Sequence, residues 1–124
     1  MQKDAEGLPL RGNRRGMLGV RVPTDIKLDD EVTRAVSPGG GGLSVVPDDP
    51  VRLPLHYRPK TLGGHGTWPV FSIEPQQLGE PLSYRPDSAK PKDHGFLEPA
   101  RVMTIEEYQA ALAGTVNEWQ EVPQ

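Results

Sequence analysis

The clearest hydrophobic pattern in the chain lies near its C-terminal end, in residues 103–119. Large apolar side chains recur there at the spacing of one helix face: Ile105, Tyr108, Leu112, Val116 and Trp119. Thr104, followed three residues later by Glu107, has the sequence of a capping box. Met103 and Tyr108 stand at the two positions of a hydrophobic staple. The pattern therefore predicts a helix over residues 103–119 with one buried face.

Apolar and polar residues alternate over short segments elsewhere, which is the pattern of half-buried strands. The expected strands are residues 17–22, 32–36, 43–46, 68–73, 78–84 and 96–98. In the second of these, Arg34 shares a face with Val32 and Val36. Because an unpaired buried charge is costly, Arg34 would need a phosphate or a carboxylate as its partner. The alternative is a surface arginine at the end of a strand.

Glycine and proline are both abundant, at 14 residues each in a chain of 124. Their combined share is well above the usual ~12% and favours loops, turns and short strands. The length fits one domain. Residues 1–16 are polar and aperiodic and contain a small arginine cluster, so they are predicted to be a flexible N-terminal arm. Residues 17–124 are predicted to form a single domain.

The composition excludes several kinds of site. The chain has no cysteine, which excludes disulfides, thiolate nucleophiles and cysteine zinc sites. The formal net charge of −3 argues against a protein that coats nucleic acid, because such proteins are usually basic. No apolar run approaches the ~18 residues that span a membrane, and the N-terminus lacks the apolar core of a secretory signal. The spacing of His56, His65 and His94 matches no helical metal pair, so no metal site is expected.

Candidate chemistry begins at the glycine-rich residues 37–44. Four consecutive glycines can bring backbone N–H groups close to a ligand, although the segment matches neither a Walker nor a Rossmann pattern. Ser44 places a hydroxyl where this loop meets a strand. On a strand, His94 and Glu98 would share one face about 13 Å apart. Tyr57 and Trp68 could stack on a flat ligand ring, and packing in the core is the alternative for each.

Three short motifs resemble a known family. They are TRAVS at residues 33–37, GLSVV at residues 42–46 and HGFLEPARVM at residues 94–103. Together with the following helix and its late tryptophan, Trp119, they are similar to small ADP-ribosyltransferase-like toxins of the bacterial type VI secretion or toxin–antitoxin kind. The resemblance covers roughly two thirds of the chain, and the third motif is its most specific part. It implies an α+β fold, a small mixed domain of two short twisted β-sheets flanking a cleft, with a C-terminal helix.

The resemblance also implies a site and a substrate, NAD. In the family, the strand serine and the histidine before the Pro-Ala motif are needed for toxicity, and these positions are Ser44 and His94. Transfer of ADP-ribose passes through an oxocarbenium-like state. The chemistry of this reaction suits Arg34 as a ligand of the diphosphate and Glu98, which the family pattern does not include, as an anionic stabiliser. The NAD-binding residues expected on this basis are Arg34, Gly42, Ser44, Tyr57 and Trp68.

One spacing departs from the family. Only a glycine loop separates the arginine motif from the serine motif, whereas the family has a longer segment there. Either the domain is trimmed, or Arg34 is not the equivalent arginine. A second expectation is geometric: Ser44 and His94 must lie within about 12 Å of each other if they share one small ligand.

The resemblance further implies a toxin that acts in the cytoplasm of a target cell, reaches it without a cleaved signal peptide, and is neutralised by a cognate immunity protein or antitoxin. Two other functions remain open. The proline-rich middle of the chain is compatible with a non-enzymatic protein-interaction module. A nuclease toxin could use His56, His65 or His94 as acid and base.

Overall fold

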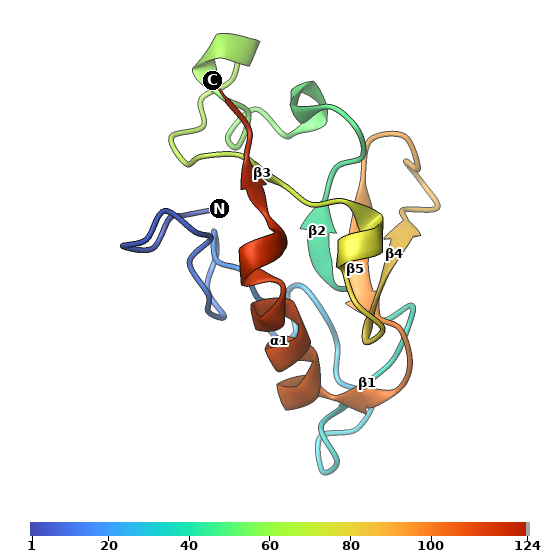
Figure 1. The fold of residues 1–124 in the computed structure, drawn as a ribbon. Helices are drawn as coiled ribbons and strands as arrows, with labels where there is room; N and C mark the ends of the chain where they lie inside the picture. Colours follow the sequence, from blue (N-terminus) through green and yellow to red (C-terminus); the bar gives the residue numbers. More distant parts are fainter. Residues whose placement is uncertain (124) are drawn as a thin grey trace.

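A three-stranded antiparallel sheet and one helix form the two main parts of the fold (Figure 1). The computed structural model describes residues 1–123. The sheet consists of β2 (Leu43–Val45), β4 (Leu82–Pro86) and β5 (Gly95–Pro99), in the order β2-β5-β4. Because β5 is the middle strand, it pairs with β4, which precedes it by a short loop, and with β2, which is distant in sequence.

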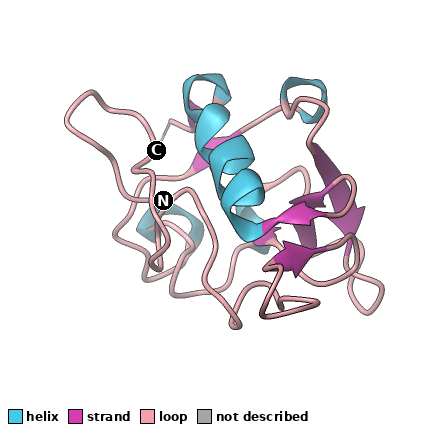
Figure 2. Ribbon diagram, turned by 90° about the horizontal axis from the view of Figure 1, so that it is seen from below, coloured by secondary structure: helices cyan, strands magenta, loops and turns pink. Residues whose placement is uncertain are grey.

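Two further sheets are pairs of very short strands. β1 (Ala35–Val36) pairs with β6 (Met103–Thr104), and β3 (Phe71–Ser72) pairs with β7 (Gln120–Glu121). The structure therefore has three small sheets rather than the two predicted, because turns and prolines end these pairs after two residues. The mixed α+β class with a helix near the C-terminus is confirmed, and Figure 2 shows that helix beside the strands with most of the remaining chain in loops.

The helix α1 (Ile105–Gly114) begins as its sequence predicts. The Glu107 N–H donates to the Thr104 hydroxyl at 3.1 Å, and the Thr104 N–H donates to the Glu107 carboxylate at 3.3 Å. This is a complete capping box, which satisfies two N–H groups that a helix start leaves without partners. The predicted cap is confirmed.

The same helix ends earlier than predicted. The Thr115 hydroxyl donates to the Leu112 carbonyl at 2.7 Å and accepts the Trp119 indole N–H at 2.9 Å. This hydroxyl bridge replaces helical bonding after Gly114, and a 3₁₀ turn at Val116–Glu118 follows. The predicted apolar face is nevertheless buried along its full length: Ile105, Tyr108, Leu112, Val116 and Trp119.

Tyr108 connects the helix to the central sheet. Its ring is fully buried, and its hydroxyl accepts the Leu43 N–H at 3.1 Å while donating to the Leu97 carbonyl. Burial raises the pKa of the hydroxyl far above its usual value of 10.0, so it remains a donor even in alkaline solution. One side chain thus ties β2 and β5 together from inside the core.

The predicted strand over residues 17–22 is not formed, although Leu18 and Val20 are buried. The backbone of Val20 is hydrogen-bonded by the Gln109 side chain and not by a neighbouring strand. Its N–H donates to Gln109 Oε1 at 3.1 Å, and its carbonyl accepts from Gln109 Nε2 at 2.6 Å. The amide of Gln109 thus supplies the bonds of a neighbouring strand.

The predicted strand over residues 32–36 is also wrong in its first half. The Asp30 carboxylate accepts the N–H groups of Val32 and Thr33 at 2.7 and 3.2 Å, and this contact builds a turn. Arg34 follows in the left-handed conformation, with φ of 60°, so its side chain leaves the predicted apolar face. Only Ala35–Val36 remains as a strand.

Other predicted strands are kept, shortened or shifted. The strands over 43–46 and 96–98 are confirmed as β2 and β5. The strand over 68–73 is reduced to β3, and the one over 78–84 is moved toward the C-terminus as β4.

Residues 1–16, predicted to be a flexible arm, contact the rest of the domain. The backbone pairs at Lys3↔Pro9 and again at Arg11↔Leu18. Pro9 is buried, and Lys3 forms an ion pair with Glu121 at 2.6 Å. These contacts place the segment beside the C-terminal strand β7. Within residues 1–123, the longest helix has ten residues, and none could cross a membrane.

Candidate functional site

The β2-β5-β4 sheet has a core face and a polar face, because successive side chains of a strand point to opposite sides. The core face carries Leu43, Val45, Leu82, Tyr84 and Leu97. We call the opposite side the polar face, and it carries Ser44, Ser83, Arg85, Phe96 and Glu98. His94, directly before β5, extends the row formed by Phe96 and Glu98. The structure therefore brings all three candidate catalytic residues to one face.

Ser44 and His94 are neighbours on the polar face. Ser44 lies directly opposite Phe96 in the β2–β5 ladder, and the His94 ring meets the Phe96 ring edge-on, with centroids 4.7 Å apart. His94 stands two residues before Phe96, so it lies diagonally across from Ser44, and diagonal neighbours in a sheet are typically up to about 8 Å apart. A typical spacing of this kind is compatible with the expected limit of about 12 Å for sharing one small ligand. Ser44 is exposed and His94 is partly exposed, so both can be reached from solvent.

His94 is held by an aspartate that follows β4. Asp87 Oδ2 lies 2.9 Å from His94 Nδ1, and the Asp87 N–H donates to the His94 carbonyl at 2.9 Å. The hydrogen bond from His94, followed by one from the Ala89 N–H, lowers the pKa of Asp87 below its usual value. The pair has the form of an imidazole oriented by a carboxylate, which is common where histidine acts on a ligand.

Glu98 is buried, and its carboxylate is fully engaged. Arg85 Nε donates to both of its oxygens at 2.8 Å, and the Gly39 N–H donates to Oε2 at 2.8 Å. The hydrogen bond to Glu98, followed by the charge of that carboxylate, raises the pKa of Arg85. Glu98 and His94 share a row but are four residues apart along it. Glu98 bonds to Arg85, and His94 bonds to Asp87. Glu98 is thus well placed to anchor the glycine loop over the sheet.

Arg34, the expected diphosphate ligand, lies away from Ser44. Its Nε donates to Glu106 at 2.7 Å at the start of α1, and about half of its side chain is exposed. The hydrogen bond from Arg34 lowers the pKa of Glu106. Arg34 lies in the left-handed turn directly before β1, and its carbonyl accepts the Ile105 N–H at 2.8 Å, so it belongs to the β1–β6 sheet and the helix start rather than to the polar face.

Tyr57 and Trp68, each expected either to stack on a ligand ring or to pack in the core, stack on each other. Their ring centroids are 6.0 Å apart at an interplanar angle of 27°. The Arg15 guanidinium lies 5.6 Å from the Tyr57 ring and 5.5 Å from the Trp68 ring. A Cβ added at Gly16 would lie 2.5 Å from the Trp68 ring. The cluster joins the N-terminal segment to the proline-rich loop through packing and cation–π contacts.

Gly42, another expected NAD contact, is required by close backbone packing. A Cβ added there would lie 2.4 Å from the Leu97 carbonyl oxygen, and the Gly42 N–H donates to the Asp25 carbonyl at 2.8 Å. Its backbone is therefore used within the fold, at the point where the glycine loop enters β2.

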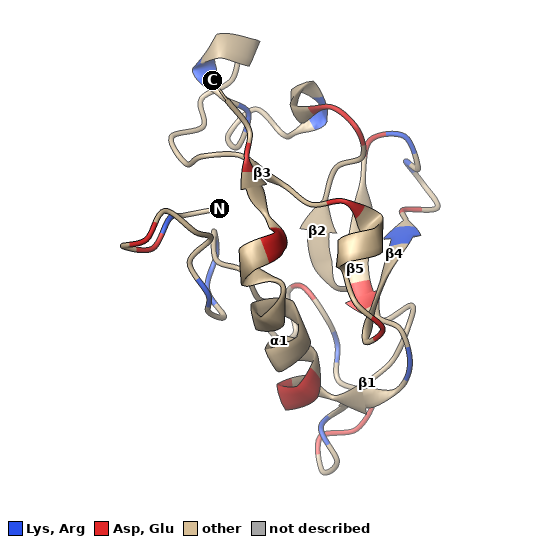
Figure 3. Ribbon diagram, viewed as in Figure 1, with Lys and Arg blue, Asp and Glu red and all other residues tan. Residues whose placement is uncertain are grey.

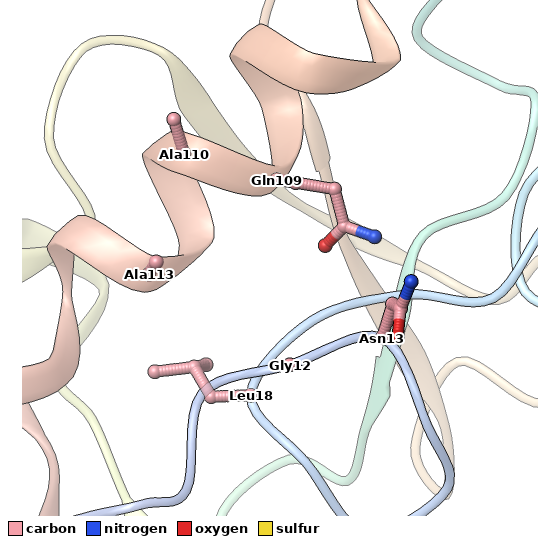
Figure 4. A pocket seen from close by; sticks show the side chains of 6 residues that line it. All are labelled: Gly12, Asn13, Leu18, Gln109, Ala110 and Ala113. Atoms are coloured by element: carbon pink, nitrogen blue, oxygen red, sulfur yellow. The ribbon is translucent and has the colours of Figure 1, made fainter.

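Two surface grooves run between α1 and the N-terminal segment. The first has a volume of about 370 Å³ and is lined by Gly12, Asn13, Leu18, Gln109, Ala110 and Ala113. Figure 4 shows the Gln109 and Asn13 side chains extending toward each other across it. The second, of about 640 Å³, adjoins it and includes Arg21 and Arg34. Both arginines are already paired with carboxylates, and neither groove reaches Ser44 or His94, so the polar face carries more of the available chemistry.

Residues 1–123 show neither a patch of one charge nor a metal site that would compete with the polar face as the candidate site. Acidic and basic positions are interspersed along the ribbon in Figure 3. No group of three or more histidine, aspartate or glutamate side chains in this part of the chain converges to hold a metal ion.

Sequence reasoning missed Arg85 on the polar face and Asp87, which follows β4 and contacts His94. A signal for Arg85 was present, because Leu82 and Tyr84 alternate with Ser83 and Arg85 in a period of two. Asp87 stands two residues before an N–H that it accepts, which is the pattern of an Asx turn. Neither signal indicates that Arg85 would bond to Glu98 or that Asp87 would bond to His94.

No family model matches this chain, and the comparisons with curated proteins and with solved structures give no match either.

Proposed function

We propose that this protein is an ADP-ribosyltransferase-like toxin domain that binds NAD over the polar face. The observation that carries the proposal is the placement of Ser44 and His94 as diagonal neighbours on one accessible sheet face. The mixed α+β fold, with a central antiparallel sheet and a capped helix after its middle strand, also supports an ADP-ribosyltransferase-like architecture.

The chemistry of the face suits this reaction. The bond between the nicotinamide nitrogen and ribose C1′ breaks, and its electron pair leaves with nicotinamide. An acceptor nucleophile then bonds to C1′ and gives its proton to a base or to water. Hydrogen bonds to the ribose hydroxyls that strengthen in the oxocarbenium-like state lower the barrier. In the proposal, Ser44 and His94 make these bonds, and the Arg85–Glu98 pair keeps the glycine loop in place beside them.

The proposal includes a protein partner that neutralises the toxin in the cytoplasm where it acts. Three exposed apolar side chains in the proline-rich segment favour such a contact: Val51, Leu55 and Leu62. Arg52 in the same segment pairs with Asp93, next to His94, at 2.9 Å. A partner bound to this segment would border the polar face and could close it to NAD. The same exposed side chains would also serve a non-enzymatic interaction module, which NAD binding distinguishes.

The test is to compare the wild type with Ser44→Ala and His94→Ala for growth inhibition on expression and for nicotinamide release from NAD by the purified proteins. We expect each substitution to reduce turnover by roughly 100-fold, a usual contribution for such groups. NAD should also raise the melting temperature of the wild type.

Matched controls are Ser72→Ala and His65→Ala, which remove an exposed serine and an exposed histidine outside the polar face. Both should behave as the wild type. The proposal fails if the wild type and the two site variants are equally harmless or equally harmful, or if NAD leaves the melting temperature unchanged.

A further inference from the structure

The loop between β4 and β5 holds the His94 imidazole from one side. Within residues 87–94, the Asp87 carbonyl accepts the Lys90 N–H at 3.1 Å, and the Lys90 carbonyl accepts the His94 N–H at 3.0 Å. The loop is therefore closed on itself and returns His94 to a position beside Asp87. The geometry depends on local backbone bonds, so it is formed before any ligand arrives.

The two oxygens of Asp87 have different tasks. Oδ1 accepts the Ala89 N–H at 2.9 Å and fixes the carboxylate to the loop. Oδ2 lies 2.9 Å from His94 Nδ1. About a quarter of the Asp87 side chain and a third of the His94 side chain are exposed, so the contact is partly shielded from water. A carboxylate can only accept, and a neutral imidazole in this pair must therefore carry its hydrogen at Nδ1.

We propose that Asp87 is a positioning residue for His94: it fixes the tautomer with hydrogen at Nδ1 and leaves the lone pair of Nε2 for the ligand. The inference rests on the proposed function, because the ligand there is the ribose of NAD. A ribose hydroxyl donates its hydrogen bond to Nε2, and the edge-on contact with Phe96 limits rotation of the ring. Asp87 acts through His94 and does not itself touch the substrate.

The first experiment measures the tautomer directly by long-range ¹H–¹⁵N NMR correlation of the histidine rings, at a pH where His94 is neutral. In the wild type, the Nε2 nitrogen should have the chemical shift of an unprotonated ring nitrogen. In Asp87→Asn, the Nδ1–H form should lose its preference, because the amide can donate to Nδ1. A wild-type spectrum dominated by the Nε2–H form, or one unchanged by Asp87→Asn, would overturn the proposal.

The second experiment measures NAD cleavage by the same proteins. Asp87→Asn should lower kcat at least roughly tenfold and leave KM within about threefold, because the other substrate contacts remain while the bond to Nε2, which strengthens in the oxocarbenium-like state, is lost. Asp93→Asn is the matched control, since it removes the adjacent carboxylate, which pairs with Arg52, and should leave both kcat and the His94 tautomer unchanged. Equal loss in both variants would refute a specific role for Asp87.

Asn at position 87 can still accept the Ala89 N–H, so the loop should keep its fold. If Asp87→Asn nevertheless unfolds, Asp87→Ser preserves a turn acceptor but is too short to reach the imidazole, and it should show the same loss of tautomer preference. A wild type that does not cleave NAD would refute the proposed function, while the NMR result would still decide whether Asp87 sets the His94 tautomer.

Discussion

The two faces of the β2-β5-β4 sheet differ in the side chains that they present: one is buried and mostly apolar, and the other carries polar and charged groups. The core face buries Leu82 and Leu97, and its hydrogen-bonding is completed by the Tyr108 hydroxyl from the helix. The polar face keeps Ser44 and His94 accessible and pairs its charged groups with one another. Both faces are built from the same three strands, so their difference comes from alternation along each strand.

The core face therefore contributes mainly to the stability of the fold, and the polar face carries the groups that could act on a ligand. On the core face, a side chain contributes through the apolar surface that it removes from water. On the polar face, Glu98 is buried but its carboxylate is bonded to Arg85 and Gly39, while Ser44 is exposed. Substitutions on the core face should therefore change the free energy of unfolding, and those at the open positions of the polar face should change activity.

The largest expected effect on stability contrasts adjacent residues of β5. Leu97→Ala should lower the free energy of unfolding by about 2–5 kcal/mol, because Leu97 is buried in the core and its truncation leaves a cavity. Phe96→Ala, on the polar face, should cost roughly 1 kcal/mol, as is usual for a partly exposed side chain. Urea unfolding of both variants measures the difference. Similar costs would show that the two faces are not distinct.

A smaller effect is expected from two tyrosines on the core side of the sheet. Tyr108→Phe should cost about 2 kcal/mol, because it leaves the Leu43 N–H and the Leu97 carbonyl without their partner. Tyr84→Phe is the matched control: within the described chain its buried hydroxyl has no hydrogen-bond partner. Removing it should be neutral or stabilising by up to about 1 kcal/mol. Thermal unfolding checks both, and a destabilised Tyr84→Phe would contradict this account of the core face.

The smallest effect is a dependence on pH at the polar face. The pKa of Asp87 is lowered in the folded protein from its ordinary value of 3.8, so its ionised form favours folding. This contribution is present above the ordinary value and is lost as the pH falls through the lower folded-state pKa. The gap in melting temperature between wild type and Asp87→Asn should therefore close as the pH falls below 3.8 and through the lower folded-state pKa. A gap that widens on acidification would reverse the assigned sign.

Much of the fold near the C-terminus follows from short-range signals. Thr104 and Glu107 cap α1 as expected, and the apolar face of the helix is buried along its length. The cap joins residues three positions apart, and the face depends on a repeat of 3.6 residues, so both can be predicted from local sequence. The end of the helix could not, because the Thr115 hydroxyl is held by Trp119, whose own position depends on packing in the core.

Local sequence predicted much less of the candidate site than of the C-terminal helix. Arg34 was assigned to the site through an expected strand, but Asp30 turns the chain before it and Glu106 takes its side chain. Tyr57 and Trp68 were read as separate ligand contacts, and their stack with Arg15 could not be seen from spacing. The Asp30 turn is a local contact, but the partners of these three side chains, Glu106 and Arg15, are distant in sequence and outweigh the local pattern.

The sequence by itself determined the capped helix, the strands β2 and β5, and the presence of a serine and a histidine beside them. Only the tertiary structure decided that these two strands pair in the register that sets Ser44 opposite Phe96 and next to His94, and that Arg85 and Asp87 join them. The physical reason is that helices and caps are formed by contacts within a few residues. A sheet face is assembled from segments that must first be brought together, and a shift of one residue would turn every side chain to the other side.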